Sequence, residues 1–353
     1  MKPSLVKDEV CCAVRAGRPL FLWGPPGVGK SMIMRQVAGD LFAADYGLRV
    51  DGAGRAFAAD GAPVPVPPYL VDLRAVLLDP VDLRGIPTVV DGRVRWAVPE
   101  FFPRDGRGIL FLDEVNAAPP LIQAGLYQLV LDRRLGEYAL PAGWSVMAAG
   151  NRETDRAVVS RMSSALGSRF GHVEVEVDVH DWIAWALGAG VAAEVVAFIR
   201  WRPGLLHVFE PAKNERTFPC PRTWEFVSDF LKAGPAPDFE FDLYSGVVGE
   251  GAASEFVGFL RVFRDLPDID EILRAPGSAQ VPGEDEVSVL YAVAGALARR
   301  STVQNFAAVM KYADRLPGEF GVVLVRDAER LHPEVIKTRA YIEWHAGHSE
   351  VYV

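Results

Sequence analysis

Short apolar runs alternate with longer stretches of helical period over the first part of the chain. Each apolar run has the length of a buried strand and is bounded by turn-forming residues. On this basis we predict strands over residues 19–23, 69–76, 108–112, 144–149 and 173–177. Strands that alternate with helices are typical of a mostly parallel sheet with helices on both faces. The pattern therefore predicts an α/β unit over residues 1–178.

The pattern changes to amphipathic helices after about residue 179. Helices are predicted there over residues 181–187, 191–201, 222–232, 254–263, 286–299, 302–314 and 318–330. The most apolar stretch, 182–199, contains Glu194 and a glycine-containing break at 188–190. These features favour two short helices over a membrane span. We therefore predict an α-helical region over residues 179–353.

Two hairpins are predicted within the α/β unit. The β-prone segments 88–90 and 93–96 flank an Asp-Gly pair at 91–92, which is a strong hairpin signal. Residues 133–140 allow a second, smaller hairpin. Residues 45–68 are rich in Gly, Ala and Pro and predict a surface connection.

Composition narrows the class of protein. The 353 residues include 37 Lys and Arg against 46 Asp and Glu, which gives a net charge of −9. An acidic total argues against a surface built mainly to bind nucleic acid. Cys11 and Cys12 are adjacent, and Cys220 is the only other cysteine, so we expect a reduced, cytoplasmic protein with incidental thiols. Charged residues interrupt the first apolar region, so no signal peptide is predicted.

A phosphate-binding loop is predicted between the first strand and the helix that follows it. Residues 24–31 match the pattern G-x-x-x-x-G-K-[ST], and they lie between an apolar run and a stretch of helical period. Backbone N–H groups of such a loop surround phosphate oxygens, and the helix N-terminus favours negative charge. Lys30 would reach the β- and γ-phosphates, and the Ser31 hydroxyl would bind Mg²⁺. The predicted nucleotide-binding residues are Gly24, Pro25, Pro26, Gly27, Val28, Gly29, Lys30, Ser31 and Met32.

Two carboxylates follow the apolar run 109–112. The carboxyl end of a central strand is where α/β sheets bind ligands. Asp113 would hold the Mg²⁺ shell, and Glu114 would polarise the attacking water as a general base. A surface Asp-Glu pair is the alternative if the phosphate loop is disregarded.

Three further polar residues complete the candidate site. Asn151 follows the next strand and would hydrogen-bond the γ-phosphate and the water without adding charge; a turn residue is the alternative. Arg169, before the last strand, would reach the γ-phosphate of a neighbouring subunit. Arg161 is a second candidate for that contact, and a surface salt bridge is a third interpretation. Arg222, at the start of a helix in the second region, would reach back to the phosphates; an ordinary exposed arginine is the alternative.

Five motifs together carry a resemblance to a known family: GPPGVGKS at 24–31, LFLDEVN at 110–116, AAGN at 148–151, SRF at 168–170 and PRTW at 221–224. With these motifs the sequence resembles the AAA+ ATPases, and within them the MoxR-like and dynein-related group. The segment at about 77–103 is similar to the helix-2 insert of that group, and 133–140 to its pre-sensor-1 hairpin. The resemblance covers roughly residues 5–230.

This resemblance implies Walker A, Walker B, sensor 1, arginine-finger and sensor 2 roles for Lys30/Ser31, Asp113/Glu114, Asn151, Arg169 and Arg222. Ser168 stands where the family more often has Asp, which keeps Arg161 open as the finger. The implied fold is a P-loop NTPase αβα sandwich with a mostly parallel sheet, followed by an α-helical lid and a helical C-terminal extension. The implied cofactors are ATP and Mg²⁺. The implied assembly is a homo-oligomeric ring, usually a hexamer, that remodels or matures a protein client with a partner containing a von Willebrand factor A (VWA) domain.

Other functions remain open from the sequence. A nucleic-acid motor would need a basic pore lining, for which Arg93 and Arg95, or Arg133 and Arg134, are the local candidates. A small-molecule P-loop kinase would need neither Asn151 nor the two later arginines in this order. A nucleotide-gated scaffold without turnover would not need an intact Glu114.

Overall fold

The computed structural model describes residues 1–155, 162–213 and 216–347. The chain forms two compact units. Unit 1 comprises Met1–Asp181 and Glu210–Glu215, and unit 2 comprises Trp182–Phe209 and Arg216–Val353. The chain first passes from unit 1 to unit 2 after Asp181, and the predicted domain boundary is at residue 178.

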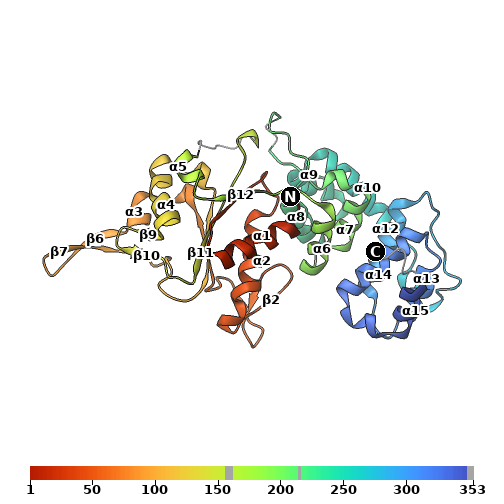
Figure 1. Ribbon diagram of the computed structural model, residues 1–353. Helices are drawn as coiled ribbons and strands as arrows, with labels where there is room; N and C mark the ends of the chain where they lie inside the picture. Colours follow the sequence, from red (N-terminus) through yellow and green to blue (C-terminus); the bar gives the residue numbers. More distant parts are fainter. Residues whose placement is uncertain (156–161, 214–215, 348–353) are drawn as a thin grey trace. The chain divides into compact units, whose positions relative to one another are not determined.

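Unit 1 is built on a five-stranded parallel sheet (Figure 1). In spatial order the strands are β12 (Gly171–Glu174), β1 (Leu20–Trp23), β11 (Trp144–Gly150), β8 (Gly108–Asp113) and β5 (Leu70–Arg74). The predicted parallel sheet is confirmed. One strand begins earlier than predicted: β12 begins at Gly171, whereas the prediction began at residue 173. It begins there because Gly171 N donates to Pro19 O at 3.0 Å and starts the pairing with β1.

Helices cover both faces of this sheet. Successive residues of a strand point to opposite faces, so Ile109 and Phe111 of β8 enter one core and Leu110 and Leu112 the other. The first core is closed by α1 (Pro3–Ala16) and α2 (Lys30–Phe42), and the second by α4 (Pro120–Asp132) and α5 (Ser164–Gly167). Unit 1 is therefore a three-layered αβα sandwich.

The predicted surface connection at 45–68 contains short strands. After η1 (Ala43–Tyr46) this segment forms a small three-stranded antiparallel sheet of β2 (Arg49–Val50), β3 (Ala56–Phe57) and β4 (Pro63–Val64). Strands of two residues are too short to show an alternating pattern, which explains why the sequence did not predict them.

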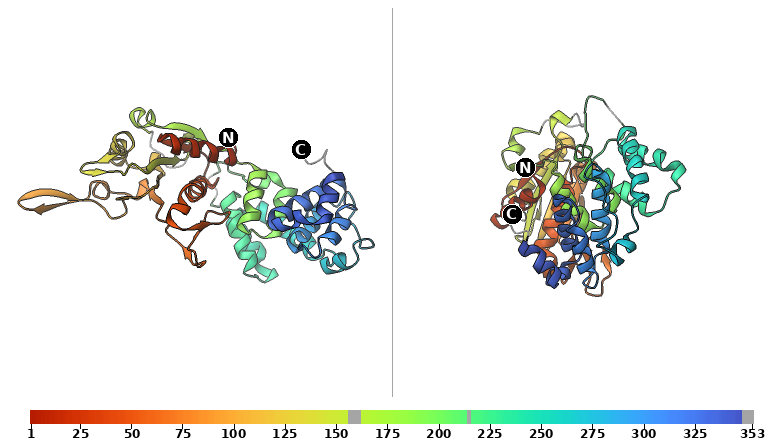
Figure 2. Two further views of the ribbon diagram at one scale, coloured as in Figure 1. Left: turned by 60° about the horizontal axis from the view of Figure 1, so that its bottom comes forward. Right: turned by 90° about the vertical axis from the view of Figure 1, so that its right-hand side faces the viewer.

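The predicted hairpin at 88–96 is confirmed. After η2 (Ala75–Leu77) and α3 (Pro80–Arg84), β6 (Ile86–Val90) pairs antiparallel with β7 (Arg93–Ala97). Asp91 and Gly92 have φ of 52° and 71°, as a type I′ turn requires at both central positions. Every residue of both strands is exposed, and the ribbon projects from unit 1 in Figure 1 and in the left view of Figure 2.

The second predicted hairpin is also present, as β9 (Arg134–Leu135) and β10 (Tyr138–Ala139). The described part of unit 1 also contains two single turns, η3 (Val115–Ala117) and η4 (Glu153–Asp155). Both follow the carboxyl ends of central strands, so they lie in the region of the candidate site.

Unit 2 is helical. Its elements are α6 (Val179–Ala189), which begins in unit 1, α7 (Ala193–Trp201), η5 (Pro203–Leu205), α8 (Pro221–Lys232), η6 (Pro237–Phe239), α9 (Glu240–Val248), α10 (Glu250–Arg264), α11 (Ile269–Arg274), α12 (Val287–Arg300), α13 (Phe306–Ala313), α14 (Gly318–Leu331), η7 (Pro333–Lys337) and α15 (Arg339–Gly347). The predicted break at 188–190 is confirmed, because Gly190 adopts φ 75° between α6 and α7. Among the described helices none is long and apolar enough to cross a membrane.

A buried ion pair ties two helices of unit 2 together. The Arg200 guanidinium of α7 pairs with the Asp327 carboxylate of α14, with one N–O distance of 2.6 Å. The two side chains are only 11% and 2% exposed. A desolvated pair of this kind depends on both partners, since either charge alone would be buried without compensation.

Candidate functional site

The predicted phosphate loop lies between β1 and the N-terminus of α2. Gly29 precedes α2 with φ 98°, a left-handed conformation that side chains disfavour. A Cβ on Gly24 would lie 2.9 Å from the carbonyl oxygen of Val175, so the loop packs closely against the residue after β12. Among the described residues no side chain caps the start of α2. Its first N–H groups are therefore available to an anion.

Lys30 connects the loop to the end of another strand. Its ammonium donates to the carbonyl oxygens of Gly24 at 2.8 Å and Pro25 at 3.1 Å. It also donates to Asn151 Oδ1 at 2.9 Å, just beyond β11. Lys30 is only 9% exposed. The structure thus brings together two predicted site residues that lie far apart in the sequence.

Ser31 and Asp113 form a second link, between α2 and the end of β8. The Ser31 hydroxyl donates to Asp113 Oδ2 at 2.7 Å, and the Glu114 N–H donates to Asp113 Oδ1 at 2.9 Å. A hydroxyl and a carboxylate side by side are hard oxygen donors, and Mg²⁺ is commonly held by one or two carboxylates together with substrate phosphates. These two residues fit the predicted magnesium position.

Negative charge accumulates near this pair. Asp72 of β5 lies on the strand next to β8, two residues before the position opposite Asp113. Partial desolvation, and then the charge of Asp113, raise the pKa of the Asp72 carboxyl. A divalent cation at Ser31 and Asp113 would offset this repulsion.

Glu114 adopts an unusual backbone conformation. Its φ of 56° and ψ of 34° place a non-glycine residue in the left-handed region, where strain often accompanies function. The half-buried Glu114 side chain makes no hydrogen bond or ion pair within the described ranges. Both carboxylate oxygens are therefore available to a water, as its predicted role requires.

Asn116 is a residue of this site that sequence reasoning missed. It is 2% exposed, and its Nδ2 donates to the backbone oxygen of Asn151 at 2.6 Å. A Cβ on Gly150 would lie 2.0 Å from Asn116 Oδ1, so only glycine fits there. Asn116 therefore positions the backbone of Asn151. Its place in the LFLDEVN motif, three residues after Asp113, was the available signal.

Arg169 lies near the amino ends of the sheet strands, whereas the phosphate loop follows the carboxyl end of β1. Arg169 precedes β12, whose Gly171 pairs with Leu20 at the start of β1. The loop begins at Gly24, after the far end of β1, so about six residues of strand, or roughly 20 Å at ~3.3 Å per residue, separate Arg169 from it. The guanidinium stacks on the Tyr127 ring at 4.3 Å and donates to the Tyr127 hydroxyl and to Ala165 O.

The structure does not test the roles predicted for the two other arginines. Arg161 lies outside the described residues. Arg222 is exposed in the first turn of α8 in unit 2. Its contact with the phosphates would run from one unit to the other and stays a prediction.

Comparison with known proteins gives the following. Neither a protein-family model nor a curated protein matches the sequence. Among solved structures, NtrX from Brucella abortus in complex with ADP is similar over 99% of this chain and 68% of NtrX, with 15% identity and a TM-score of 0.40. The Thermotoga maritima RuvB Holliday junction branch migration motor is similar over 83% of this chain and 81% of RuvB, with 17% identity and a TM-score of 0.38. Similarity at this level carries no inference about function, and the fold is defined by the sheet order of unit 1.

Proposed function

We propose that this chain is a magnesium-dependent AAA+ ATPase of the MoxR-like group, which hydrolyses ATP to ADP and phosphate. The observation that carries the proposal is that the parallel strands β1, β11 and β8 bring the predicted site residues together at their carboxyl ends. Lys30 contacts Asn151, and Ser31 contacts Asp113. A loop that binds phosphates, an acid for the metal and an acid for the water are the parts that phosphoryl transfer requires.

The proposed assembly is a homo-oligomeric ring, with a hexamer as the expected form. Arg169 supports this assembly, because it lies roughly 20 Å along the sheet from the loop of its own copy. An arginine at that position serves a phosphate only when the phosphate belongs to another copy. A finger supplied in trans is worth about 10³–10⁵ in rate where it operates.

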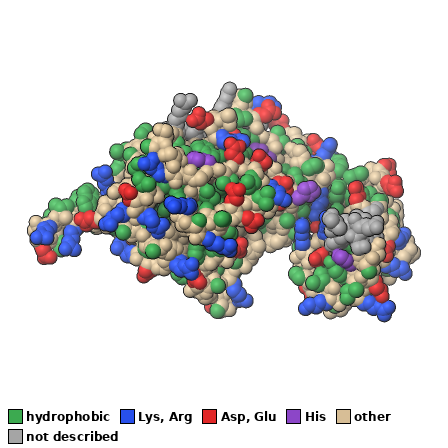
Figure 3. All heavy atoms as spheres, viewed as in Figure 1, with side chains coloured by type: hydrophobic (Ala, Val, Ile, Leu, Met, Phe, Trp, Pro, Cys, Tyr) green, Lys and Arg blue, Asp and Glu red, His purple; other side chains and the backbone are tan. Residues whose placement is uncertain are grey.

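The proposed client is a protein, remodelled or matured together with a VWA-domain partner in the cytoplasm. The β6–β7 ribbon supports contact with a partner. Its exposed side chains include Ile86 at 61%, Val89 at 76% and Val94 at 60% exposure. Hydrophobic and basic side chains of this ribbon stand out from unit 1 in Figure 3. A two-stranded ribbon is marginally stable alone, so a partner would stabilise it.

The second candidate is a nucleic-acid motor. The same ribbon favours it through Arg93 and Arg95, both exposed on β7. These two cations would approach phosphates of a nucleic-acid backbone. The net charge of −9 makes this the weaker proposal.

Affinity capture with a Glu114→Gln chain separates the two candidates. This variant is expected to bind ATP without hydrolysing it, and Lys30→Ala, which should not bind ATP, is the control. Both are used to capture partners from lysate with ATP and Mg²⁺, with and without nuclease. A nuclease-resistant VWA-domain protein, retained by Glu114→Gln only, is the expected result. Recovery of nucleic acid, with all partners lost on nuclease treatment, would favour the motor instead.

A further inference from the structure

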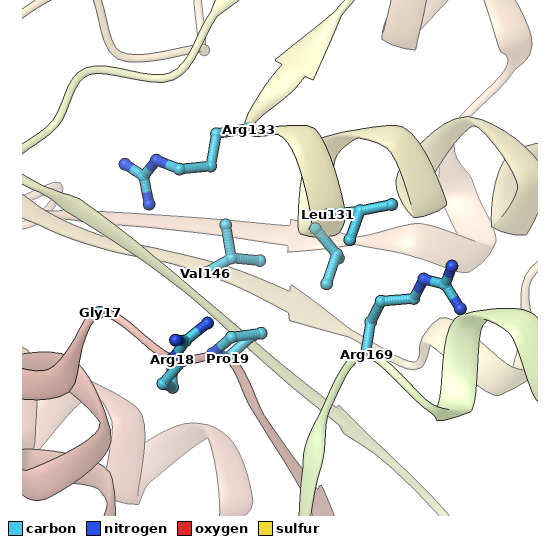
Figure 4. A pocket seen from close by; sticks show the side chains of 8 residues that line it. Gly17, Arg18, Pro19, Leu131, Arg133, Val146 and Arg169 are labelled. Carbon is cyan, nitrogen blue, oxygen red and sulfur yellow. The ribbon is translucent and has the colours of Figure 1, made fainter.

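A hollow lies near the amino ends of the strands of the unit 1 sheet, whereas the phosphate loop follows the carboxyl end of β1 (Figure 4). Its volume is about 200 Å³. It is lined by Gly17, Arg18, Pro19, Val130, Leu131, Arg133, Val146 and Arg169. Three of these eight residues are arginines, contributed by the segment before β1, the end of α4 and the segment before β12. Three arginines from separate segments therefore line one small hollow, and the guanidinium of Arg169 is directed towards α4.

The arginines differ in how firmly they are held. Arg133 Nη2 donates to the carbonyl oxygens of Pro141 and Trp144, both at 2.7 Å. Because a guanidinium has five N–H donors, Nε and Nη1 of Arg133 remain available. This fixed orientation lowers the entropic cost of binding a further acceptor.

Arg18 is the least constrained member of the group. It is exposed, and within the described ranges its side chain has no hydrogen-bond or ion-pair partner. Figure 4 shows Arg18 and Arg133 on two sides of Val146. Arg169 forms the far wall, and its guanidinium turns towards α4, where it contacts Tyr127. Its Nε is buried without an acceptor in the described part of the chain.

The charge of the hollow is not balanced by the protein. No described carboxylate forms an ion pair with Arg18, Arg133 or Arg169. Unpaired cations around a concave surface raise the local concentration of anions.

We propose that this hollow binds a phosphoryl oxyanion through Arg18 and Arg133, with Arg169 at its border. The size favours a small anion, since sites for drug-sized molecules measure about 300–1,000 Å³. Planar guanidinium groups match the oxygens of a phosphate. The phosphoryl group has two sources, free phosphate in solution or the terminal phosphate of a nucleotide held by a second copy. The second source rests on the proposed function, whereas the first does not.

The test of the first source uses inorganic phosphate. The full chain carries Lys30→Ala, which removes binding at the phosphate loop, and its unfolding temperature is measured at increasing phosphate and constant ionic strength. Arg18→Glu is compared with Lys337→Glu, which makes the same charge change at an exposed residue of unit 2. General stabilisation by phosphate is common to both chains. We expect saturable stabilisation with Lys337→Glu and at least tenfold weaker apparent affinity with Arg18→Glu.

The test of the second source mixes two variants that should each be defective in ATP hydrolysis if the hollow receives a neighbour's phosphate. Arg18→Glu chains keep their own loop and Glu114 but lack the proposed contact for a neighbour. Glu114→Gln chains supply that contact but cannot hydrolyse. If the hollow receives a neighbour's phosphate, mixing them restores hydrolysis above the sum of the separate preparations. A mixture of Lys337→Glu and Glu114→Gln controls for dilution of active chains.

Either Arg18-dependent result supports the proposal and identifies the source. Phosphate affinity equal in Arg18→Glu and Lys337→Glu, together with no gain of hydrolysis on mixing, overturns it. The proposed function fails separately, if the unmodified chain hydrolyses no ATP. In that case the phosphate titration still decides whether the hollow binds an oxyanion.

Discussion

The ammonium of Lys30 lies 2.9 Å from Oδ1 of Asn151, although 121 residues separate them in the sequence. The contact joins the phosphate loop to the end of β11, and Asn116 holds the Asn151 backbone from η3. A neutral amide beside this lysine orients the ammonium without neutralising it. The positive charge therefore remains available to the phosphates.

Replacement of Asn151 tests this arrangement. Asn151→Ala removes an acceptor of Lys30 and should lower kcat by about 10–100-fold, because one oriented donor or acceptor in a site is worth ~1.5–3 kcal/mol. ATP affinity should change less than kcat, since the loop itself is intact. Hydrolysis assays and titration calorimetry measure the two quantities. An unchanged kcat in Asn151→Ala would show that the contact is structural only.

Arg169→Ala is expected to lower kcat by about 10³-fold or more and to leave ATP binding intact, because a finger acts on the transition state. Tyr127→Phe is the matched variant. It keeps the ring under the guanidinium but removes the hydroxyl that Arg169 contacts, so a loss below about tenfold is expected. Equal losses in the two variants would mean that Arg169 acts by packing on α4.

Alkaline pH should destabilise the β9–β10 hairpin through Tyr138. Its hydroxyl donates to Pro103 O at 2.7 Å, and burial raises the pKa of Tyr138 to about 12. The unfolded chain releases this proton near pH 10. Tyr138 therefore contributes stability that is complete below pH 10 and is lost as the pH rises towards 12, by up to ~2–3 kcal/mol.

Denaturant unfolding at pH 8, 10 and 11 measures this effect. Tyr138→Phe should be less stable than the unmodified chain at pH 8, and the difference should shrink at pH 11. A difference that is constant with pH would contradict the assignment to Tyr138.

The ion pair between α7 and α14 should be the most sensitive charge in unit 2. Asp327→Asn leaves Arg200 buried without a counter-charge and should cost ~3–5 kcal/mol in the free energy of unfolding. Asp270→Asn, at an exposed pair with Arg300, is the control and should cost at most about 1 kcal/mol. Similar losses in both variants, measured by urea unfolding, would contradict this ranking.

The sequence predicted the elements whose pattern is local. The β6–β7 hairpin follows from Asp91-Gly92, since few other residue pairs adopt positive φ twice in succession. The helices α9, α11 and α15 were not predicted. Their packing in unit 2 stabilises them, and packing is not visible in a single segment.

The candidate site was also predictable only where the sequence signal is local. Lys30, Ser31, Asp113 and Asn151 were predicted from strand ends and a motif, and the structure brings them into hydrogen-bond contact. Arg18 gave no such signal, and Arg133 was considered only as part of a basic pore lining. They line one hollow because Arg18 precedes β1, which pairs with β11, and Arg133 donates to the carbonyl oxygens of Pro141 and Trp144 at the start of β11. This arrangement depends on long-range pairing.

ATP binding and hydrolysis, measured together on three chains, test the central claim most directly. The unmodified chain should hydrolyse ATP only with Mg²⁺. Glu114→Gln should bind ATP with an affinity within about threefold of the unmodified chain and lose hydrolysis, because it keeps the loop and loses the base. Lys30→Ala should lose both activities. Hydrolysis by Glu114→Gln at the unmodified rate, or no ATP binding by the unmodified chain, would contradict the account.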